Sequence, residues 1–371
     1  MKKMISDKMI APWRIDSDEE KRLANEADVS ENGREQYVQY YHDNDPVYYN
    51  KGLEMIDKVI ENFRPGASSK AKKAYVIDMV YSLHRFGCMF DEYFLFDYEH
   101  KNTAGRESFI TDKNRWEYYQ KLNTEEGRFV FNNKLETYRV FKDFYKRELI
   151  CASDKNDYEA FCVFRRKHAS FIVKPILGSG GRGIYIENES NKSNEEVFER
   201  ITENGTVVIE ELVKQDVLME SLHGYSLNTV RIPTISINQG EVVLFQPFLR
   251  IGVGISEVDN AAKGGIICPV DPDTGIVMQR GVTEAGRTYI KHPDSGIVLP
   301  GFQIPKWDEA ISFVKKLATM IPECHYVGWD CALSVDGWIM IEGNPQGQFV
   351  TQYATKEGCR PELDRLIGGN L

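Results

Sequence analysis

Between Phe171 and Gly343 the chain alternates short apolar segments with turn residues, and this pattern most restricts its fold. The strand-like segments are FIVKPI, GIYIE, TVVIEEL, TVRIPTISI, EVVLFQPFLRI, VGWDCALS and WIMIEG. They are rich in β-branched and aromatic residues, as strands joined by turns are. Helical spacing appears at 193–203, at 307–320 and in NNKLETYRVFKDFY, where Asn132 or Asn133 is the candidate N-cap. This order predicts an α+β fold of antiparallel hairpins rather than a regular βαβ repeat.

The residues before this region have a different pattern. Residues 14–64 are charged and tyrosine-rich, and helical spacing recurs in GLEMIDKVIENF and across residues 70–98. FITDKNRWEYYQKLN indicates a further helix. We therefore expect a mainly helical N-terminal unit over residues 1–128, in a chain of 371 residues that is long enough for two or three structural units.

Composition excludes several classes of function. The formal charge of −10 argues against nucleic acid as the main partner, although a local basic pocket for a nucleotide remains compatible with it. No segment approaches the roughly 20 apolar residues of a membrane span, and the N-terminus lacks the apolar core of a signal peptide. The seven cysteines form no CxxC pair and have no zinc-ligand spacing to histidine. We expect a cytoplasmic protein with reduced thiols, and the sequence leaves its oligomeric state open.

The glycine-rich loop GSGGRG matches the GxGxxG pattern, but its context excludes a Rossmann fingerprint. That fingerprint must open a helix, whereas here the loop leads directly into the strand-like segment IYIE. No GK[ST] closes it as in a Walker loop, and the HRD and DFG sequences of protein kinases are absent. A strand–loop–strand hairpin can instead fold its amide groups over phosphates. Lys174, on the entering strand, and Arg182, as a lid, could reach the same phosphates. The loop residues are Gly178, Ser179, Gly180, Gly181, Arg182 and Gly183.

GWDCALSVDGWIMIEGNPQG contains a second constellation, with a turn signal at Asp336-Gly337. A three-residue loop, Val335 to Gly337, with Gly337 in the left-handed conformation would place Asp330 opposite Glu342. Asn344 would then lie on the same face, whereas a two-residue loop would put Asp330 and Glu342 on opposite faces. We expect the three-residue register. Two carboxylates and an amide on one face form an oxygen-ligand site suited to Mg²⁺, although a surface hairpin is the plain alternative.

These two elements, in this order, resemble the ATP-grasp superfamily, and the resemblance extends from about Lys134 to Pro345. In detail the chain is similar to the sugar-transfer-associated ATP-grasp group, related to α-L-glutamate ligases. The similar stretches are NNKLETYRVF, FIVKPILGSGGRGI, VVIEELV, SLNTVRIPTI, DNAAKGGI and VGWDCAL…WIMIEGNPQG. The resemblance implies an ATP-grasp fold of two α+β subdomains that grip ATP, a lid subdomain over 129–207 and a C-terminal subdomain over 208–371.

The resemblance also implies roles for single residues. Lys134 and Lys174 would contact ATP phosphates, with Lys174 also near the adenine. Asp216 or Glu220 would bind the ribose hydroxyls, and Arg231 and Arg250 would face the transferred phosphoryl group and the acceptor. The hinge strand would read the adenine edge through Glu210, Glu211, Leu212 and Val213, with Glu210 near the amino group. One or two Mg²⁺ ions would be held by Asp330, Glu342 and Asn344.

Three functions follow as hypotheses. The first is a Mg·ATP-dependent carboxylate–amine ligase with small-molecule substrates, an acyl-phosphate intermediate, and ADP and phosphate as products; this agrees with the lack of a Ser-His-Asp or Cys-His signature. The second is a kinase that phosphorylates a sugar or another hydroxyl, with Asp259 as the candidate base. The third is a non-catalytic nucleotide-binding protein, which the presence of both lysines and all three candidate metal ligands argues against. In DNAAKGG, Asp259, Asn260 and Lys263 are candidate acceptor contacts, although a structural turn fits equally well.

Overall fold

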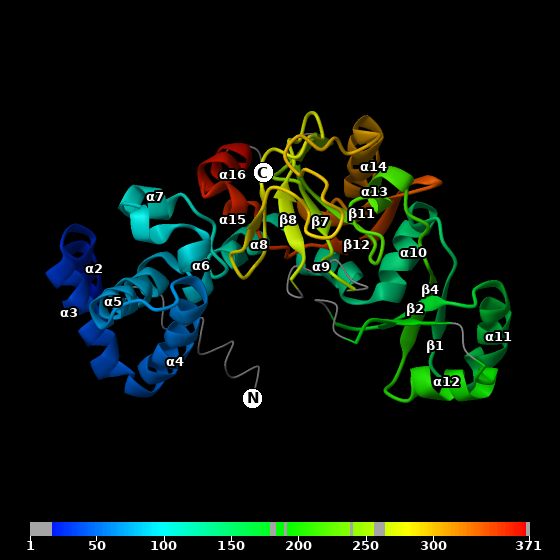
Figure 1. The fold of residues 1–371 in the computed structure, drawn as a ribbon, viewed down its shortest axis with the longest axis horizontal. Coiled ribbons are helices and arrows are strands. Elements are labelled where there is room, and N and C mark those ends of the chain that lie inside the picture. The colour runs from blue at the N-terminus through cyan, green and yellow to red at the C-terminus, as the bar shows by residue number, and fades with distance from the viewer. Residues whose placement is uncertain (1–16, 179–182, 189–190, 238–239, 256–263, 369–371) are drawn as a thin grey trace. The chain divides into compact units, whose positions relative to one another are not determined.

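The computed structural model describes residues 17–178, 183–188, 191–237, 240–255 and 264–368 (Figure 1). Contacts divide the chain into two compact units. The helical unit comprises the residues up to Tyr118 together with Glu284–Arg287 and Gln348–Leu371, and the sheet unit comprises Tyr119–Thr283 and Thr288–Gly347. The expected α+β fold with a helical N-terminal region is confirmed. No helix among the described residues has the length and apolarity needed to cross a bilayer.

The helical unit is built from capped amphipathic helices. Ser17 and Glu20 form a reciprocal capping box, and the Ser30, Asp45 and Ser68 side chains each accept a hydrogen bond from the first turn that follows. The helices are α2 (Asp18–Val29), α3 (Glu31–Asn44), α4 (Pro46–Phe63), α5 (Ser69–Phe86), α6 (Phe90–Leu95), η2 (Tyr98–His100), α7 (Thr103–Glu107), α8 (Arg115–Leu122, which crosses the unit boundary), α15 (Thr351–Thr355) and α16 (Arg360–Ile367).

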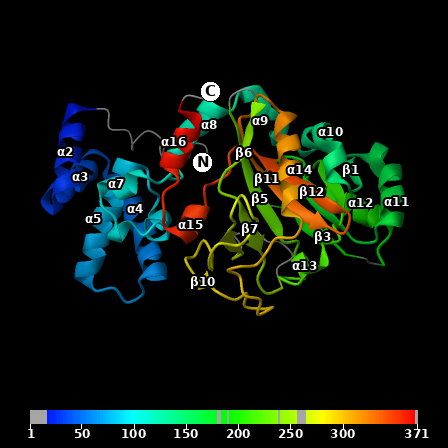
Figure 2. The same cartoon turned by 90° about the horizontal axis from the view of Figure 1, so that it is seen from above.

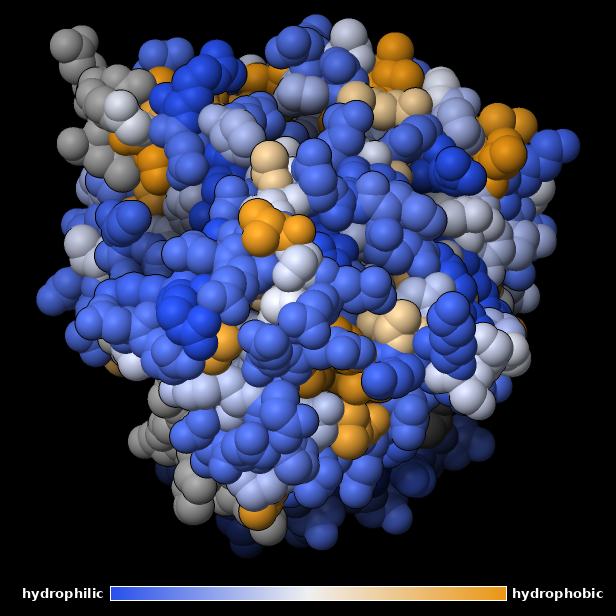
Figure 3. Space-filling view, turned by 90° about the vertical axis from the view of Figure 1, so that its left-hand side faces the viewer, coloured by the Kyte–Doolittle hydropathy of each residue, from blue (hydrophilic) through white to orange (hydrophobic). Residues whose placement is uncertain are grey.

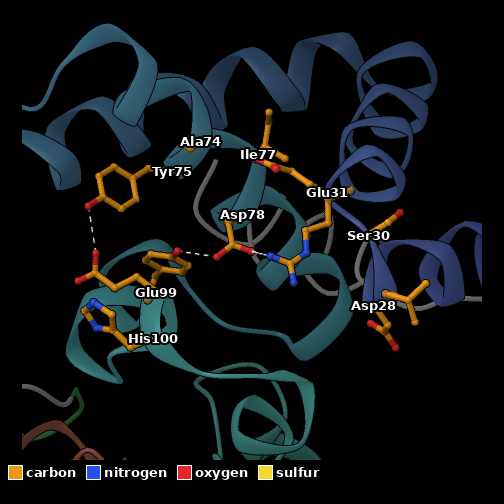
Figure 4. A pocket seen from close by; sticks show the side chains of 12 residues that line it. Asp28, Ser30, Glu31, Ala74, Tyr75, Ile77, Asp78, Glu99 and His100 are labelled. Atoms are coloured by element: carbon orange, nitrogen blue, oxygen red, sulfur yellow. Dashed lines mark hydrogen bonds and ion pairs between the residues drawn. The ribbon is translucent and has the colours of Figure 1, made fainter.

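A partly buried hydrogen-bond and ion-pair network around Asp78 joins α3, α5, α6 and α7 beside a cavity of about 530 Å³ (Figure 4). Arg106 donates to both Asp78 oxygens, from 2.7 and 2.8 Å, and Arg34 donates from 2.9 Å. Tyr93 contributes a hydroxyl, and Glu99 at the other side of the cavity accepts from Tyr75 at 3.0 Å. Asp78 and Glu99 therefore accept hydrogen bonds from residues of other helices, and these contacts hold the helices together. The face drawn in Figure 3 is mainly hydrophilic, with apolar side chains scattered over it.

Residues after Gln348 pack with the helical unit. The Gln352 side chain accepts from the Ile110 backbone and donates back to it, at 3.0 and 2.8 Å. Lys356 donates to Leu95 O, and Arg360 donates to Phe109 O. The sequence-based division placed this segment in a C-terminal subdomain over 208–371; here its contacts are those of the helical unit. The subdomain boundaries at 128/129 and 207/208 remain a proposal.

The smaller sheet of the sheet unit has the order β1-β4-β2-β3, and its described strands pair antiparallel. β2 and β3 flank the glycine-rich loop as the expected hairpin, with Phe171 paired to Glu187. Figure 1 shows α11 and α12 beside this sheet, and their apolar side chains share a core with it. The elements are β1 (Leu149–Ala152), η3 (Lys155–Asp157), α11 (Tyr158–Lys167), β2 (Phe171–Pro175), β3 (Tyr185–Glu187), α12 (Asn194–Thr202) and β4 (Val207–Glu211).

The larger sheet has the order β10-β9-β8-β7-β5-β11-β12, with β6 also paired to β5. Its Trp329 face packs against α10 and α14 (Figure 2). The ring centroids of Phe141, in α10, and Trp329 lie 5.4 Å apart. The opposite face carries the polar residues described below. The elements are α9 (Glu125–Asn132), α10 (Lys134–Tyr145), α13 (Val217–Glu220), β5 (Thr229–Ser236), β6 (Val242–Leu244), β7 (Phe248–Ile251), β8 (Ile266–Pro269), β9 (Gly281–Val282), β10 (Thr288–Tyr289), α14 (Trp307–Thr319), β11 (Tyr326–Ser334) and β12 (Gly337–Asn344).

Several local predictions are confirmed and others need correction. Asn133 caps α10, accepting from the backbone of Leu135 and Glu136. EVVLFQPFLRI forms two strands, because Gln246 has φ +53° and Pro247 cannot donate to a ladder. The short strands β1, β8, β9 and β10 were not predicted.

The predicted three-residue loop of the acidic hairpin is wrong. Ser334 pairs with Gly337, which leaves Val335 and Asp336 as a two-residue loop, and Gly337 has the expected positive φ, at +94°. A register shift at Ile341 then moves the pairing by one residue, so Asp330 still lies opposite Glu342. The expected pairing is therefore produced by a bulge and not by the loop.

Gly343→Ala should destabilise the protein by about 1–3 kcal/mol, because a Cβ there would lie 2.3 Å from the Phe131 ring and 3.2 Å from Trp329. Urea unfolding followed by circular dichroism measures the change. Gly224→Ala is the control: its Cβ would meet only Glu220 O at 4.0 Å, and we expect a change within about 0.5 kcal/mol. Equal midpoints for Gly343→Ala and wild type would contradict the packing.

Candidate active site

The smaller sheet presents a charged pair on the face opposite its helical core. Along β4, Val207 and Ile209 pack with α11 and α12, so Glu210 points to the other face. Lys174 on β2 lies on that same face, and its Nζ is 2.7 Å from Glu210 Oε1. Both side chains are buried. The sequence placed Lys174 and Glu210 at the nucleotide, and the structure brings them together.

Arg147 is a member of this site that the sequence reasoning missed. It lies two residues after the end of α10, and its Nη2 and Nε donate to Glu210 Oε2 from 2.6 and 2.8 Å. Its Nη1 donates to Met340 O in β12 at 2.7 Å. The only sequence signal for this role is the position of the arginine, between an amphipathic helix and the apolar segment LICA. Its partner lies 63 residues away, which no local pattern reports.

Arg147 and Lys174 keep the Glu210 carboxylate ionised. Burial raises the pKa of Glu210, but the attraction of Arg147 and Lys174 outweighs burial and lowers that pKa to about 2. The carboxylate is therefore ionised at neutral pH, with both oxygens engaged. A buried charge is tolerated only when it is paired in this way.

Lys134 is the first residue of α10 and lies near the entrance to the glycine-rich loop. Its Nζ donates to Gly178 O at 2.9 Å, and its backbone N–H donates to Ile176 O at 3.2 Å. Burial lowers the pKa of Lys134, the nearby charge of Lys174 lowers it further, and Glu342 opposes both effects. Lys134, Lys174 and Glu342 therefore lie close enough for their charges to interact.

A polar row crosses three strands of the larger sheet. Asp330 in β11 pairs with Arg231 in β5 on one side and with Glu342 in β12 on the other, so all three share one face. Arg231 donates to both Asp330 oxygens, one of them from 2.8 Å, and Arg250 Nη2 lies 3.0 Å from Asp330 Oδ2. Arg250 also donates to Thr229 Oγ1 at 2.8 and 2.9 Å. Burial raises the pKa of Asp330, but the two arginines hold it below its ordinary value.

Glycines make room for the Arg231 guanidinium. A Cβ on Gly328 would lie 3.0 Å from Arg231 Cδ, and a Cβ on Gly347 would lie 2.8 Å from its Nη1. Both glycines belong to the acidic hairpin segment, Gly328 to Gly347, that the sequence analysis singled out. Their small size lets the arginine lie flat against the backbone and reach Asp330.

Glu342 differs from Asp330, although the two are paired across the strands. Within the described part of the chain no cation lies in ion-pair distance of its carboxylate. Burial and the neighbouring charge of Asp330 raise the pKa of Glu342, with Lys174, Lys134 and Arg231 opposing them. Asn344 follows two residues later, and its Oδ1 accepts from Gln346 N at 2.9 Å. A carboxylate of this kind, beside a second carboxylate and an amide oxygen, suits a hard cation such as Mg²⁺.

The hinge candidates occupy the end of β4 and the residues that follow it. The Glu211 backbone N–H donates to Glu148 O at 3.0 Å, and Glu211 Oε2 accepts from Glu148 N at 3.0 Å. Asp216 caps α13, accepting from Leu218 N at 2.9 Å, whereas Glu220 is exposed at the end of that helix. Leu212 and Val213 lie beyond the strand. The choice between Asp216 and Glu220 as ribose contact remains a prediction.

The two ends of the glycine-rich loop, Gly178 and Gly183, are described, and both have positive φ, at +115° and +74°. The predicted site residues that lie outside the described part of the chain are Ser179, Gly180, Gly181, Arg182, Asp259, Asn260 and Lys263.

The sequence model of the family described as sugar-transfer associated ATP-grasp matches residues 113–367, well over half of the chain. No match is found among the curated proteins.

Three solved structures are similar to this chain at low sequence identity. The ATP-grasp ligase PsnB, complexed with a minimal precursor, Mg and ADP, is 15% identical, with 71% of this chain and 68% of PsnB covered and a TM-score of 0.40. N5-carboxyaminoimidazole synthetase from Staphylococcus aureus, complexed with ADP, is 13% identical, with 71% and 60% covered and a TM-score of 0.45. D-alanyl-alanine synthetase A from Vibrio cholerae O1 biovar eltor is 11% identical, with 60% and 57% covered and a TM-score of 0.39.

The family match spans both sheets, the glycine-rich hairpin and the acidic hairpin. The chain therefore belongs to the sugar-transfer associated ATP-grasp family and is an ATP-grasp enzyme built on that family's α+β fold.

Proposed function

We propose that the protein is a Mg·ATP-dependent ligase that activates a carboxylate as an acyl phosphate and joins it to an amine. The observation that carries the proposal is the polar row Arg231–Asp330–Glu342, whose Glu342 interacts with the charges of Lys134 and Lys174. Cations and an available carboxylate together match the needs of phosphoryl transfer, which depends mainly on positioning and charge neutralisation.

The nucleotide would bind between the charged face of the smaller sheet and the polar row. Lys134 and Lys174 would contact phosphates. Each lysine about 4 Å from a phosphate oxygen contributes on the order of 4 kcal/mol at an effective dielectric constant near 20. The backbone of residues 210–213 would read the adenine edge.

Magnesium fits the donor set of the acidic hairpin. Glu342, Asn344 and Asp330 would hold one or two ions. Two paired carboxylates and an amide oxygen on one face, with no described cation in ion-pair distance of Glu342, favour a cation there. When bound, Mg²⁺ would neutralise charge on the phosphate oxygens as the phosphoryl group moves. Asp330 is already paired with two arginines, so Glu342 is the residue with more unneutralised charge to offer.

Arg231 and Arg250 would orient the acceptor. A substrate carboxylate oxygen attacks the γ-phosphorus, the bond to the bridging oxygen breaks, and ADP leaves with that electron pair. The amine then attacks the acyl carbon, phosphate departs, and the amine loses a proton as the amide forms. Guanidinium groups suit planar carboxylate and phosphate oxygens because they donate in a fork.

Phosphate release from Mg·ATP should require both a carboxylate and an amine. A panel of amino acids, small carboxylates and sugar acids, with mass spectrometry of the products, tests this. Free phosphate with a new amide mass supports the ligase. A product heavier by one phosphoryl group, without free phosphate, would identify a kinase acting on a hydroxyl instead.

Glu342→Gln should lower kcat/KM for ATP by about 100-fold, because the site loses an anionic ligand for the magnesium ion that would neutralise the phosphate oxygens. The folding stability of the variant, in contrast, should equal or exceed that of wild type. Since the folded protein raises the pKa of Glu342, ionisation costs stability as pH rises through that raised value. Without magnesium at pH 8, the variant should therefore melt at or above the temperature of wild type, and added Mg·ADP should stabilise it less.

The matched control is Glu241→Gln, an exposed carboxylate on the residue before β6. We expect it to leave both the kinetics and the Mg·ADP response unchanged. Full activity of Glu342→Gln would refute the assignment of Glu342.

A further inference from the structure

One guanidinium joins the two sheets of the sheet unit. Arg147 donates to Glu210 on β4 through Nε and Nη2, and to Met340 O on β12 through Nη1. Nη1 also donates to Tyr145 O at 3.1 Å, and the Tyr145 ring lies 4.5 Å from the guanidinium carbon. Only 4% of the Arg147 side chain is exposed. The planar fork of arginine is needed to serve both sheets at once, since a lysine offers one compact ammonium.

The chain of contacts continues from Glu210 to Lys174. Arg147 occupies Glu210 Oε2 with two hydrogen bonds, so the carboxylate cannot turn freely, and Oε1 faces Lys174 at 2.7 Å. The place of the Lys174 ammonium is thereby fixed relative to β12, the strand that carries Glu342. No other described residue is hydrogen-bonded to both β4 and β12 through its side chain in this way.

We infer that Arg147 is a positioning residue of the nucleotide site, which clamps Glu210 to β12 and so holds Lys174 where nucleotide phosphates can meet it. The role of Lys174 rests on the proposed function. The role of Arg147 rests on the contacts above, and Arg147 itself need not touch the nucleotide.

The arrangement also lets Lys174 change partner. The charged and titratable groups that act on Glu210 or feel its charge are Arg147, Lys174, Lys134, Tyr138, Tyr145 and, through Lys134, Glu342. Of these, Arg147 and Lys174 contact the carboxylate directly. When the Lys174 ammonium turns toward a phosphate, Arg147 still pairs with Glu210. The buried carboxylate is then never left without a cation, which would be strongly destabilising.

A double-mutant cycle tests the inference with Arg147→Met, Glu210→Gln and the variant carrying both changes. The affinity for Mg·ADP is measured by titration calorimetry, and KM for ATP is measured in parallel. Each single variant should bind Mg·ADP about tenfold more weakly, the range expected for a lost charge-assisted hydrogen bond. The double variant should also bind about tenfold more weakly rather than 100-fold, because Arg147 acts through Glu210.

The control for removal of an arginine is Arg139→Met, an exposed residue of α10 that pairs with Glu136. It should bind Mg·ADP as wild type does. If Arg147→Met alone does not fold, the comparison becomes Glu210→Gln against the double variant, which contains no buried carboxylate at this position. We expect equal affinities for those two.

Additive losses, wild-type affinity in Arg147→Met, or weaker binding by the double variant than by Glu210→Gln would each overturn the inference. A purely structural Arg147 would lower the urea midpoint and leave Mg·ADP affinity unchanged. Wild type that binds Mg·ADP but forms no amide would refute the ligase and leave the inference standing. Wild type that fails to bind Mg·ADP would refute both.

Discussion

The buried carboxylate of Asp330 and its two arginines determine the arrangement of the site. Asp330 lies on the central strand of the polar row, and its charge would be costly there without Arg231 and Arg250. The pairing requires β5, β7 and β11 to lie in one register, because Arg231 is the direct strand partner of Asp330 and Arg250 is the partner of Thr229. It also requires glycines at 328 and 347, where any side chain would meet the Arg231 guanidinium. A slip of one residue would turn Asp330 into the apolar core.

The bulge at Ile341 shows how the hairpin satisfies two demands at once. Trp338 and Met340 pack in the apolar core on the Trp329 face. Strict alternation would send Glu342 to that same face, where its charge would have no partner. The register shift between Cys331 and Asp330 reverses the alternation, so Glu342 joins Asp330 while Gly343 returns to the core side against Phe131. The extra residue thus lets Trp338 and Met340 pack in the apolar core while Glu342 lies on the polar face.

Sequence patterns were sufficient where the cause is local. Asn133 caps its helix, Gly337 adopts positive φ, and the glycine-rich segment lies between paired strands, since each depends on neighbouring residues. They failed where the cause is distant. The bulge depends on packing against Phe131 and Trp329, Arg147 depends on a carboxylate 63 residues away, and the place of Gln352 depends on Ile110. β9 and β10, with two residues each, are too short to have a period.

Asp330 and Glu342 face each other with opposite electrostatic environments. The pKa of Asp330 is held low by two arginines in contact, whereas burial and Asp330 itself raise the pKa of Glu342. Two like charges on neighbouring strands are tolerated because one of them is already neutralised. Under the proposed function, a divalent cation at this face would gain most from Glu342 and would relieve the repulsion between Glu342 and Asp330. Lys134 and Lys174 also oppose the raised pKa of Glu342. Neither is in ion-pair contact with it, because the Lys174 ammonium pairs with Glu210 and the Lys134 ammonium donates to Gly178 O.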